Sequence, residues 1–328
     1  MKFWVGLSTF LLSASCFAAS QTCADALSLF AENDMFFSDR YYTNGLKIQW
    51  THGGGNLWTN AAQFAVLDLF VKDSPKAKRF QTLSLGQNMY VPRSIKIPVP
   101  SLSDRPYAGW LYLNAASHVA TENSLDTFAI TAGIFGRHSY AGDVQQWWHD
   151  TFDFDDPLGW DYQLDDEFGF VLSYKHSQRV WRAKTGALEC DAIVSGAVDA
   201  GNVMCQGVLS ALLRVGSNLP ESFDFCRIDY ASSTDVAYSR GGSDFHFYFQ
   251  CGASARFVGY DITINGGAFA SSPYKLNPEW FVCEPMGGFS LRYKNAQADF
   301  NLTYRTRDFR GQDIGHHTFW TVSLKYLF

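Results

Sequence analysis

Apolar and polar residues alternate one for one along many stretches of this 328-residue chain. The last stretch carries Thr321, Ser323 and Lys325 on one side. Its other side carries Trp320, Val322, Leu324, Tyr326 and Phe328. A period of two places alternate side chains on opposite faces of a sheet. The pattern therefore predicts strands with one aromatic-rich apolar face and one small or polar face.

The same alternation recurs throughout the chain and predicts about a dozen strands. The apolar positions are Leu46, Ile48 and Trp50; Phe128, Ile130, Ala132 and Ile134; Phe168, Phe170, Leu172 and Tyr174; Phe245, Phe247 and Phe249; Val258, Tyr260, Ile262 and Ile264; and Phe300, Leu302 and Tyr304. The division into strands stays open between residues 186 and 218. No repeat or linker marks a second domain, so residues 19–328 are expected to form one domain.

Strands of this kind suit a membrane. No segment approaches the roughly 18 to 20 apolar residues of a transmembrane helix, but a barrel strand needs only about 9 to 11 alternating residues. Only helices and closed barrels satisfy their backbone in lipid. We therefore expect an all-β protein, a closed antiparallel transmembrane β-barrel with its polar face inward. A chain that ends on an aromatic residue in such a strand also resembles the C-terminal signal of bacterial outer-membrane barrels. The alternative for this segment is the last strand of a soluble β-sandwich.

The N-terminus has the composition of a signal peptide, residues 1–18. Lys2 precedes the apolar stretch FWVGLSTFLLSA, and small residues before Ala19 suit cleavage after Ala18. Six cysteines remain after cleavage, without zinc-type CxxC spacing, and their pairing stays open. The net charge of −6 and the absence of a Lys/Arg-rich run argue against a nucleic-acid partner.

Two segments interrupt the alternation. Residues 53–78 form a long, partly helical stretch. In residues 137–167, Val144, Trp148 and Phe152 lie on one helical stripe, while Gln145 and His149 share another at i and i+4. Asp143 suits the N-cap of this short helix, and Pro157 is expected to end it.

The parity of the strands predicts where polar residues meet. If the N-terminus is periplasmic, the first strand (about residues 25–33) runs outward and brings Asn33 and Asp34 to the outer rim. The second strand starts at that rim near Thr43. Strands near residues 79–90, 107–118 and 125–135 follow, so the His149 helix lies in an outer loop. Asn33, Asp34, Thr43 and His149 are thus expected at one end of the barrel.

These residue types suggest hydrolytic chemistry. A neutral imidazole is a natural general base for activating water. The carboxylates near His149 are hard oxygen ligands that suit Ca²⁺, which acts as a Lewis acid. Each feature also has a plain explanation: His149 as an ordinary loop histidine, the acidic run as a solvated face, and Asn33-Asp34 as a turn. The sequence contains no EF-hand spacing and no GxSxG elbow.

Several separate motifs carry a family resemblance. AENDMFFSDRYYTNG, LGQNMYVP, DRPYAGWLYL and VQQWWHDTFDFDDPLGWDYQLDDE, spread over residues 31–167, resemble the lipid A 3′-O-deacylase family of outer-membrane enzymes. The C-terminal half matches only in strand character and in the terminal Phe328. The resemblance implies a twelve-stranded barrel whose active site faces the outer leaflet beside a loop helix.

The family mechanism, which is similar to that of secreted phospholipase A2, implies roles for particular residues. His149 activates water, Gln145 arranges the site, and Asp34 binds a Ca²⁺ ion that polarises the ester carbonyl. Asn33 and Thr43 complete the motifs of the first two strands. The resemblance places a second acidic calcium ligand, on the helix side of the site, at Asp155, although Asp153 and Asp156 compete for this role. The Arg and Tyr of DRPYAGW either bind a lipid phosphate or cap the rim.

The expected function is therefore calcium-dependent removal of the 3′-acyloxyacyl group from lipid A in lipopolysaccharide, by a monomer embedded in outer-membrane lipid. An outer-membrane phospholipase with the same histidine and calcium is the nearest alternative. A non-catalytic barrel, either porin or scaffold, is an alternative of another class. The acid-rich helix loop and the Asn33-Asp34 pair argue against it, since a channel needs neither.

Overall fold

The computed structural model describes most of the chain that was expected to form the barrel. The described residues are 25–35, 40–53, 66–69, 77–230 and 245–328. The predicted signal peptide (1–18), Cys23 and most of the loop at 53–78 lie outside these residues.

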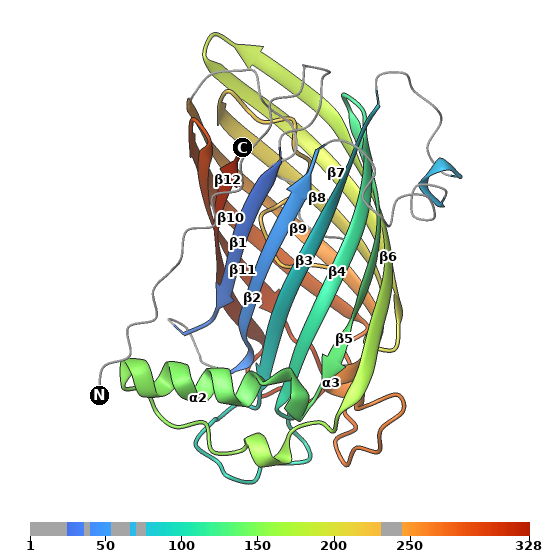
Figure 1. Ribbon diagram of the computed structural model, residues 1–328, viewed down its shortest axis with the longest axis vertical. Coiled ribbons are helices and arrows are strands. Elements are labelled where there is room, and N and C mark those ends of the chain that lie inside the picture. The colour runs from blue at the N-terminus through green and yellow to red at the C-terminus, as the bar shows by residue number, and fades with distance from the viewer. Residues whose placement is uncertain (1–24, 36–39, 54–65, 70–76, 231–244) are drawn as a thin grey trace.

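Twelve antiparallel strands close into one barrel, in which each strand pairs with its neighbours in sequence and β1 pairs with β12 (Figure 1). The strands are β1 (Ala26–Asn33), β2 (Tyr41–His52), β3 (Lys78–Val91), β4 (Ala108–Ala120), β5 (Ser124–Phe135), β6 (Glu167–Thr185), β7 (Leu188–Gly201), β8 (Met204–Ser217), β9 (Phe245–Asp261), β10 (Phe281–Tyr293), β11 (Ala296–Thr306) and β12 (His316–Leu327). The helices are η1 (Arg137–Ser139), α2 (Ala141–Phe152), η2 (Trp160–Tyr162) and α3 (Ile262–Asn265). The fold prediction is confirmed, and the predicted ends of the first five strands differ from these bounds by at most about two residues.

The side chains alternate as predicted, with apolar residues on the outer face and polar residues on the inner face. In β12, Leu324 and Tyr326 are exposed on the outer wall, while Ser323 and Lys325 are buried in the lumen. Exposed apolar residues follow the same parity on β1 and β6. An aliphatic and aromatic outer face is what a barrel presents to lipid. Among the described residues, no helix is both long enough and apolar enough to cross a bilayer.

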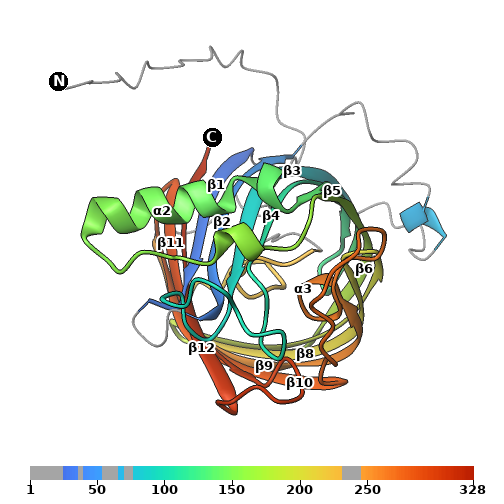
Figure 2. The same ribbon diagram turned by 90° about the horizontal axis from the view of Figure 1, so that it is seen from below.

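The two ends of the barrel differ. Asp25, before β1, and Phe328, after β12, lie together at one end, where the Phe328 amide donates to the Asp25 carbonyl (2.9 Å). Helix α2 lies at the other end, beside the β1–β2 connection (Figures 1 and 2). We call these the terminal end and the α2 end. The parity argument predicted this placement of the helix relative to the first strand.

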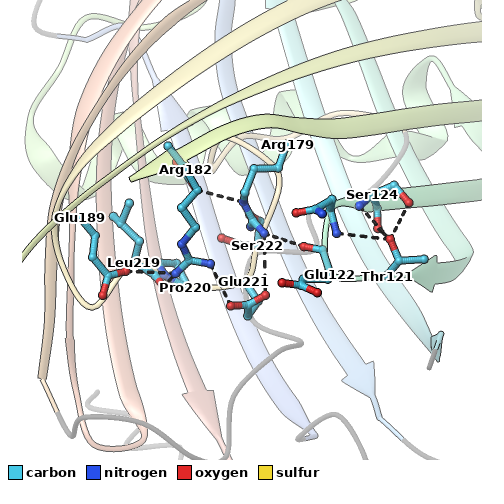
Figure 3. Close-up of polar contacts among 12 residues, drawn as sticks. Thr121, Glu122, Ser124, Arg179, Arg182, Glu189, Leu219, Pro220, Glu221 and Ser222 are labelled. Carbon is cyan, nitrogen blue, oxygen red and sulfur yellow. Dashed lines mark hydrogen bonds and ion pairs between the residues drawn. The ribbon is translucent and has the colours of Figure 1, made fainter. Parts of the chain in front are cut away.

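A segment of the chain itself occupies the lumen, which the sequence did not predict. Residues 218–230, which follow β8, contribute Phe223, Phe225 and Cys226 to buried clusters inside the barrel. We call residues 218–230 the inner segment. Figure 3 shows its first part meeting arginines of β6: Arg182 binds Glu221 (3.0 Å) and the Leu219 carbonyl (3.2 Å). The expected wet interior is therefore partly filled by protein.

Buried ion pairs line the lumen around the inner segment. The Glu284 carboxylate, which has no exposed surface, accepts from Arg227 of the inner segment (2.9 Å), Arg256 (3.3 Å) and Arg305 (2.6 Å). Asp191 holds Arg179 and Arg214 in the same way (3.2 and 2.6 Å). Such charges are tolerated in a protein interior because each is paired and hydrogen-bonded. A cavity of about 130 Å³ remains between the inner segment and the wall.

One predicted strand face is wrong. Val258, Ile262 and Ile264 were expected to face lipid, but all three are buried on the inner side. Strand β9 ends at Asp261, and the next four residues form α3, whose N-cap is the Asp261 side chain accepting from the Thr263 amide (2.9 Å). Val258 and Ile262 pack with Trp110 and Phe135 in an apolar cluster at this end of the barrel. The inner side of the barrel is apolar here because it is filled by this cluster, so the apolar positions of β9 mark the inner face.

The ends of α2 also differ from the prediction. Tyr140, in the left-handed conformation, is the N-cap, and Asp143 instead lies in the first turn, where a carboxylate favours the helix dipole. The helix ends at Phe152 because Asp153 adopts a left-handed conformation with φ of 59°. Pro157, the predicted terminator, lies five residues beyond that end.

Candidate functional site

Asp34 and Thr43 meet where β1 ends and β2 begins. The Thr43 hydroxyl donates to the Asp34 carboxylate (3.0 Å), and the other carboxylate oxygen accepts from the Arg40 amide (2.8 Å). Tyr42 pairs with Tyr90 and Asn44 with Met89, so Thr43 is the extra residue of a β-bulge. A bulge redirects a side chain from its regular position in the strand. Thr43 and Asp34 are both buried at this point.

Asn33 is the last residue of β1, and its side chain follows the outward parity of Leu27 and Leu29. Its amide oxygen accepts from the Met35 amide (2.6 Å), which forms a tight turn. Pairing continues one residue further, where the Asp34 amide donates to the Thr43 carbonyl (3.3 Å). Asn33 therefore follows the outward parity, while Asp34 is buried beside Thr43.

Glu32, the residue before this pair, is turned into the lumen. Its carboxylate accepts from the Tyr42 hydroxyl (2.6 Å), the Thr321 hydroxyl (3.0 Å) and the Ile228 amide of the inner segment (2.8 Å). One buried carboxylate thus joins β1, β2, β12 and the inner segment directly behind Asn33 and Asp34. The interior network holds the strand ends that carry the motif.

Helix α2 is docked on the outer wall by its N-terminal end. Gly109 of β4 packs so closely against Ser139 and Ala141 that a Cβ atom there would overlap both. Gln87 of β3 donates to the Ser139 carbonyl (2.6 Å). The glycine of the DRPYAGW motif therefore serves as a contact surface for the helix that carries His149.

Gln145 and His149 lie on the buried side of α2 with Ala141. The His149 Nδ1 atom donates to the Asp155 carbonyl (2.5 Å), because a carbonyl oxygen can only accept. In the neutral ring, Nε2 then carries the lone pair. The Gln145 Oε1 atom accepts from the Trp160 indole N–H (2.7 Å), and Trp160 packs on Tyr107 of DRPYAGW (5.0 Å between ring centroids).

The acids that follow α2 lie on the surface. The Asp155 carboxylate pairs with Lys96 (2.6 Å), and both side chains are more than half exposed. Gln146 donates to Asp150 (2.8 Å) and Asp156 (3.1 Å). In the described part of the chain, no three His, Cys, Asp or Glu side chains are grouped as a metal site would need.

The donor atoms near Asp34 nevertheless suit calcium. A carboxylate and a hydroxyl oxygen meet at Asp34 and Thr43, and the Asn33 amide oxygen belongs to the preceding residue; these are the hard ligands that Ca²⁺ takes, together with carbonyl and water oxygens. A single protein carboxylate would then be supplemented by neutral oxygens. Asp155 would have to exchange its ion pair with Lys96 to take part.

An apolar groove runs beneath α2 on the outer wall. It has a volume of about 540 Å³, within the usual range of ligand pockets. Its lining residues are Leu29, Phe30, Ala31, Leu46, Lys47, Ile48, Leu85, Gly86, Gln87, Leu111, Val144, Val322 and Leu324. The groove therefore opens on the face of the barrel that meets lipid, between β12, the first four strands and the helix.

The Arg and Tyr of DRPYAGW cap the rim from within. Arg105 is almost fully buried and binds Asp308 (3.2 Å) and the Thr263 hydroxyl (3.1 Å). Tyr107 is also buried and donates to the Ile95 carbonyl (3.2 Å). Of the two roles that the sequence left open, the structure supports the cap, because neither side chain is accessible to a lipid phosphate.

The pKa values of two carboxyl groups at the rim are shifted in opposite directions. Burial raises the pKa of Asp104 although its oxygens accept from the Arg93 and Arg105 amides. The Tyr41 hydroxyl donates to Asp313 (2.6 Å) and lowers the pKa of that carboxyl. Tyr41 itself adopts a positive φ of 64° at the start of β2, which is uncommon for a residue other than glycine. The rim beside Asp34 is thus held by several local interactions.

Sequence reasoning missed four residues that shape this site: Glu32, Lys96, Gly109 and Trp160. Glu32 stood inside the recognised AEND motif, and its inward parity was visible from the alternation. Gly109 and Trp160 lay in quoted motifs, but their contacts join segments about 30 and 15 residues apart. No periodic signal marks such contacts.

Taken together, these features define a transmembrane β-barrel with a buried polar cluster at one rim and an apolar groove on its outer wall, which is the class of outer-membrane β-barrels. The family model described as "Outer membrane protein LpxR" matches residues 5–328, so the chain belongs to the LpxR family of the bacterial outer membrane. This confirms the family resemblance stated from the motifs.

One solved structure supports the same fold. LpxR from Salmonella typhimurium is 16% identical, with a TM-score of 0.75, and the match covers 92% of this chain and all of that one. The translocator domain of the autotransporter NalP from Neisseria meningitidis is 9% identical, with a TM-score of 0.37, over 94% of this chain and 88% of that one. No curated protein matches the sequence.

Proposed function

We propose that this protein is a calcium-dependent ester hydrolase that removes the 3′-acyloxyacyl group from lipid A at the outer leaflet of the outer membrane. The observation that carries the proposal is the state of His149. Its Nδ1 atom donates to the Asp155 carbonyl, on a helix that lies against a groove in the lipid-facing wall. Membership of the LpxR family supports the same assignment.

His149 is the proposed general base. With Nδ1 held by a carbonyl, the Nε2 lone pair is available to take a proton from water as that water attacks an ester carbonyl. Burial of the ring keeps its orientation constant. Gln145 lies one helical turn earlier and is bound by Trp160. This contact would fix the position of the buried side of the helix relative to the barrel wall.

Asp34, Asn33 and Thr43 would hold the calcium ion, with Asp155 as a further candidate beside Asp153 and Asp156. When bound, Ca²⁺ supplies Lewis-acid polarisation of the ester carbonyl and stabilises negative charge on its oxygen. The Thr43 hydroxyl and the Arg40 amide orient the Asp34 carboxylate at the strand end. Lys96 neutralises Asp155 in the arrangement described above.

The groove supports a lipid substrate. Its lining is almost wholly aliphatic and it lies on the wall that meets the outer leaflet, so an acyl chain could enter it sideways from the membrane. A water-soluble ester would not need an apolar binding surface of this kind. The substrate ester would then lie at the level of the polar side chains at the rim.

Two other functions compete with this one. A phospholipase would use the same residues on a different lipid. A porin is disfavoured by the inner segment and by the ion pairs that cross the lumen, such as Arg227 with Glu284.

The test is to incubate the purified barrel with lipid A, with and without a calcium chelator, and to weigh the products by mass spectrometry. We expect loss of the 3′-acyloxyacyl mass only with calcium. Replacing His149 by Ala should lower the rate by about 10²- to 10⁴-fold, the usual contribution of a general base. The variant should still show the heat-dependent gel shift of a folded barrel.

The matched control is His176→Ala, because His176 is half-exposed in the middle of β6, where it contacts Asp126 of β5. It should leave turnover unchanged. No calcium-dependent loss of mass would overturn the enzymatic proposal. If glycerophospholipids lost acyl chains and lipid A did not, the substrate would be wrong while the mechanism stood.

A further inference from the structure

Helix α2 lies across the strands and outside the barrel, so its axis runs roughly parallel to the plane of a membrane that the barrel spans (Figures 1 and 2). Only its N-terminal end is closely packed on the wall, at Gly109. Val144, about one turn from that end, contributes to the lining of the groove. The C-terminal half carries the exposed side chains of Trp147, Trp148 and Phe152.

The helix has an apolar arc of which only Val144 meets the barrel wall, while its aromatic side chains are exposed. Val144, Trp148 and Phe152 recur every four residues, and Trp147 widens the stripe. Trp147 and Phe152 are 62% and 52% exposed, which is far above the values of core aromatics such as Trp110. In the described part of the chain, the aromatic ring contacts of Trp148 are with its neighbours in this arc. Its ring centroid lies 4.4 Å from that of Phe152. Exposed aromatic surface of this extent marks an interaction site.

The opposite side of α2 is polar. Asp143 and Asp150 lie about 140° and 160° around the helix axis from Trp148, since each residue advances by about 100°. The stripe with Gln145 and His149 lies between these two sides. The helix is therefore amphipathic, and its three sides have three different surroundings.

We infer that the apolar arc, formed by Val144, Trp147, Trp148 and Phe152, anchors α2 in the acyl chains of the outer leaflet. The arc is continuous through Val144 with the groove wall, where Leu29, Ile48 and Leu324 are exposed to lipid. Trp residues favour the boundary between headgroups and hydrocarbon, because the ring is amphipathic. An in-plane helix with Trp and Phe on one face is the usual form of an interfacial anchor.

This anchor differs from common interfacial helices in its charge. Such helices carry Lys and Arg on the polar side, whereas α2 carries Asp143 and Asp150. Attraction to anionic lipid cannot hold it, so attachment depends on apolar contact alone. The inference is independent of the proposed reaction, because it concerns where the helix lies and not what His149 does.

The experiment uses quenching of tryptophan fluorescence in the full-length barrel, reconstituted in phosphatidylcholine vesicles. Subtracting the spectrum of the Trp147→Phe, Trp148→Phe variant from that of the unchanged protein isolates the two indoles. We expect this difference signal to lose most of its intensity when the vesicles carry bromine near the headgroup end of the chains. Bromine near the chain ends should quench it less, and aqueous iodide should quench it little, at low and high salt alike.

Trp110→Phe provides the matched control, because Trp110 is 1% exposed inside the barrel and its difference signal should resist both kinds of quencher. Strong quenching of the Trp147 and Trp148 signal by iodide, without quenching by brominated lipid, would overturn the inference. Resistance to both quenchers would mean that a second copy of the chain covers the arc, which also overturns it. Heat-dependent gel mobility checks folding, and Trp147→Phe alone gives the same comparison if the double variant fails to fold.

Discussion

The lumen and the α2 end of the barrel use polar side chains differently. In the lumen, Asp191 and Glu284 are each surrounded by guanidinium groups, and the inner segment adds further partners. At the α2 end, Asp34 is buried, accepts from the Thr43 hydroxyl and the Arg40 amide, and lies 4.0 Å from His317, while His149 donates to the Asp155 carbonyl. The lumen carboxylates are neutralised by guanidinium groups, whereas the hydrogen bonds of Asp34 and His149 are to a hydroxyl, an amide and a carbonyl group.

This difference separates stability from function. The lumen contacts join strands that are far apart in sequence, so removing one leaves a buried charge without compensation. Helix α2 is attached at few points, so a change there alters the position of His149 more than the stability of the barrel. Variants of the two regions should therefore differ in what they change.

The largest effect on stability is expected for Asp191→Ala. It leaves Arg179 and Arg214 without their buried carboxylate, which should cost about 3–5 kcal/mol. The midpoint of urea unfolding, followed by gel mobility, measures this loss. Glu221→Gln is the control, because its pair with Arg182 is partly exposed and should contribute less than about 1 kcal/mol. Equal midpoints for both variants would contradict the role given to the lumen.

Gly109→Ala tests the attachment of α2. The added Cβ overlaps Ser139 and Ala141, and overpacking of this kind costs about 1–3 kcal/mol. We expect faster hydrogen exchange in residues 141–152 with little change in the unfolding midpoint of the barrel. Gly207→Ala serves as the control, since a Cβ at Gly207 meets open space. A lower midpoint with α2 unaffected would reverse the assignment.

Trp160→Phe removes the indole donor to Gln145 and keeps most of the aromatic packing on Tyr107. The loss of one hydrogen bond, about 1 kcal/mol, should lower turnover about fivefold. Steady-state deacylation assays measure this change. Trp181→Phe, an exposed residue of β6, should leave the rate unaltered. If Trp160→Phe changes only stability, Gln145 does not depend on that contact for its position in the site.

The smallest effect on stability is expected for Asp155→Asn. Its pair with Lys96 is exposed and should contribute between about 0 and 1 kcal/mol. If Asp155 binds calcium, the calcium concentration for half-maximal activity should nevertheless rise. Asp153→Asn and Asp156→Asn are the matched comparisons, and a larger shift for either one would transfer the ligand role to it.

Much of the fold was predictable because the pleat converts sequence directly into faces. The alternation of Leu324 and Tyr326 with Ser323 and Lys325 needs no tertiary information, since lipid imposes the same demand on every strand. The parity of the strands likewise placed α2 at the same end as Asn33, Asp34 and Thr43. The prediction failed for the stretch from Val258 to Ile264 because the inner side of β9 packs into an apolar cluster there and the strand gives way to α3.

The cysteines and the inner segment show the limit of such reasoning. Among the described residues, Cys190, Cys205, Cys251 and Cys283 are free, which sequence could only leave open. Residues 218–230 carry no periodic pattern, and their position depends on scattered partners such as Glu32 and Arg214. A segment that fills space by single contacts has no signature along the chain.

The sequence by itself determined the barrel, the lipid-facing side of most strands and the end at which the polar motifs gather, because these follow from local periodicity and chain parity. The tertiary structure alone decided that Thr43 lies in a bulge against Asp34, that Gly109 receives α2, and that His149 is held through the Asp155 carbonyl. These contacts depend on register and packing between segments that share no common period. The local pattern determines which face of the sheet a side chain occupies, whereas contacts between distant segments form only when the barrel closes.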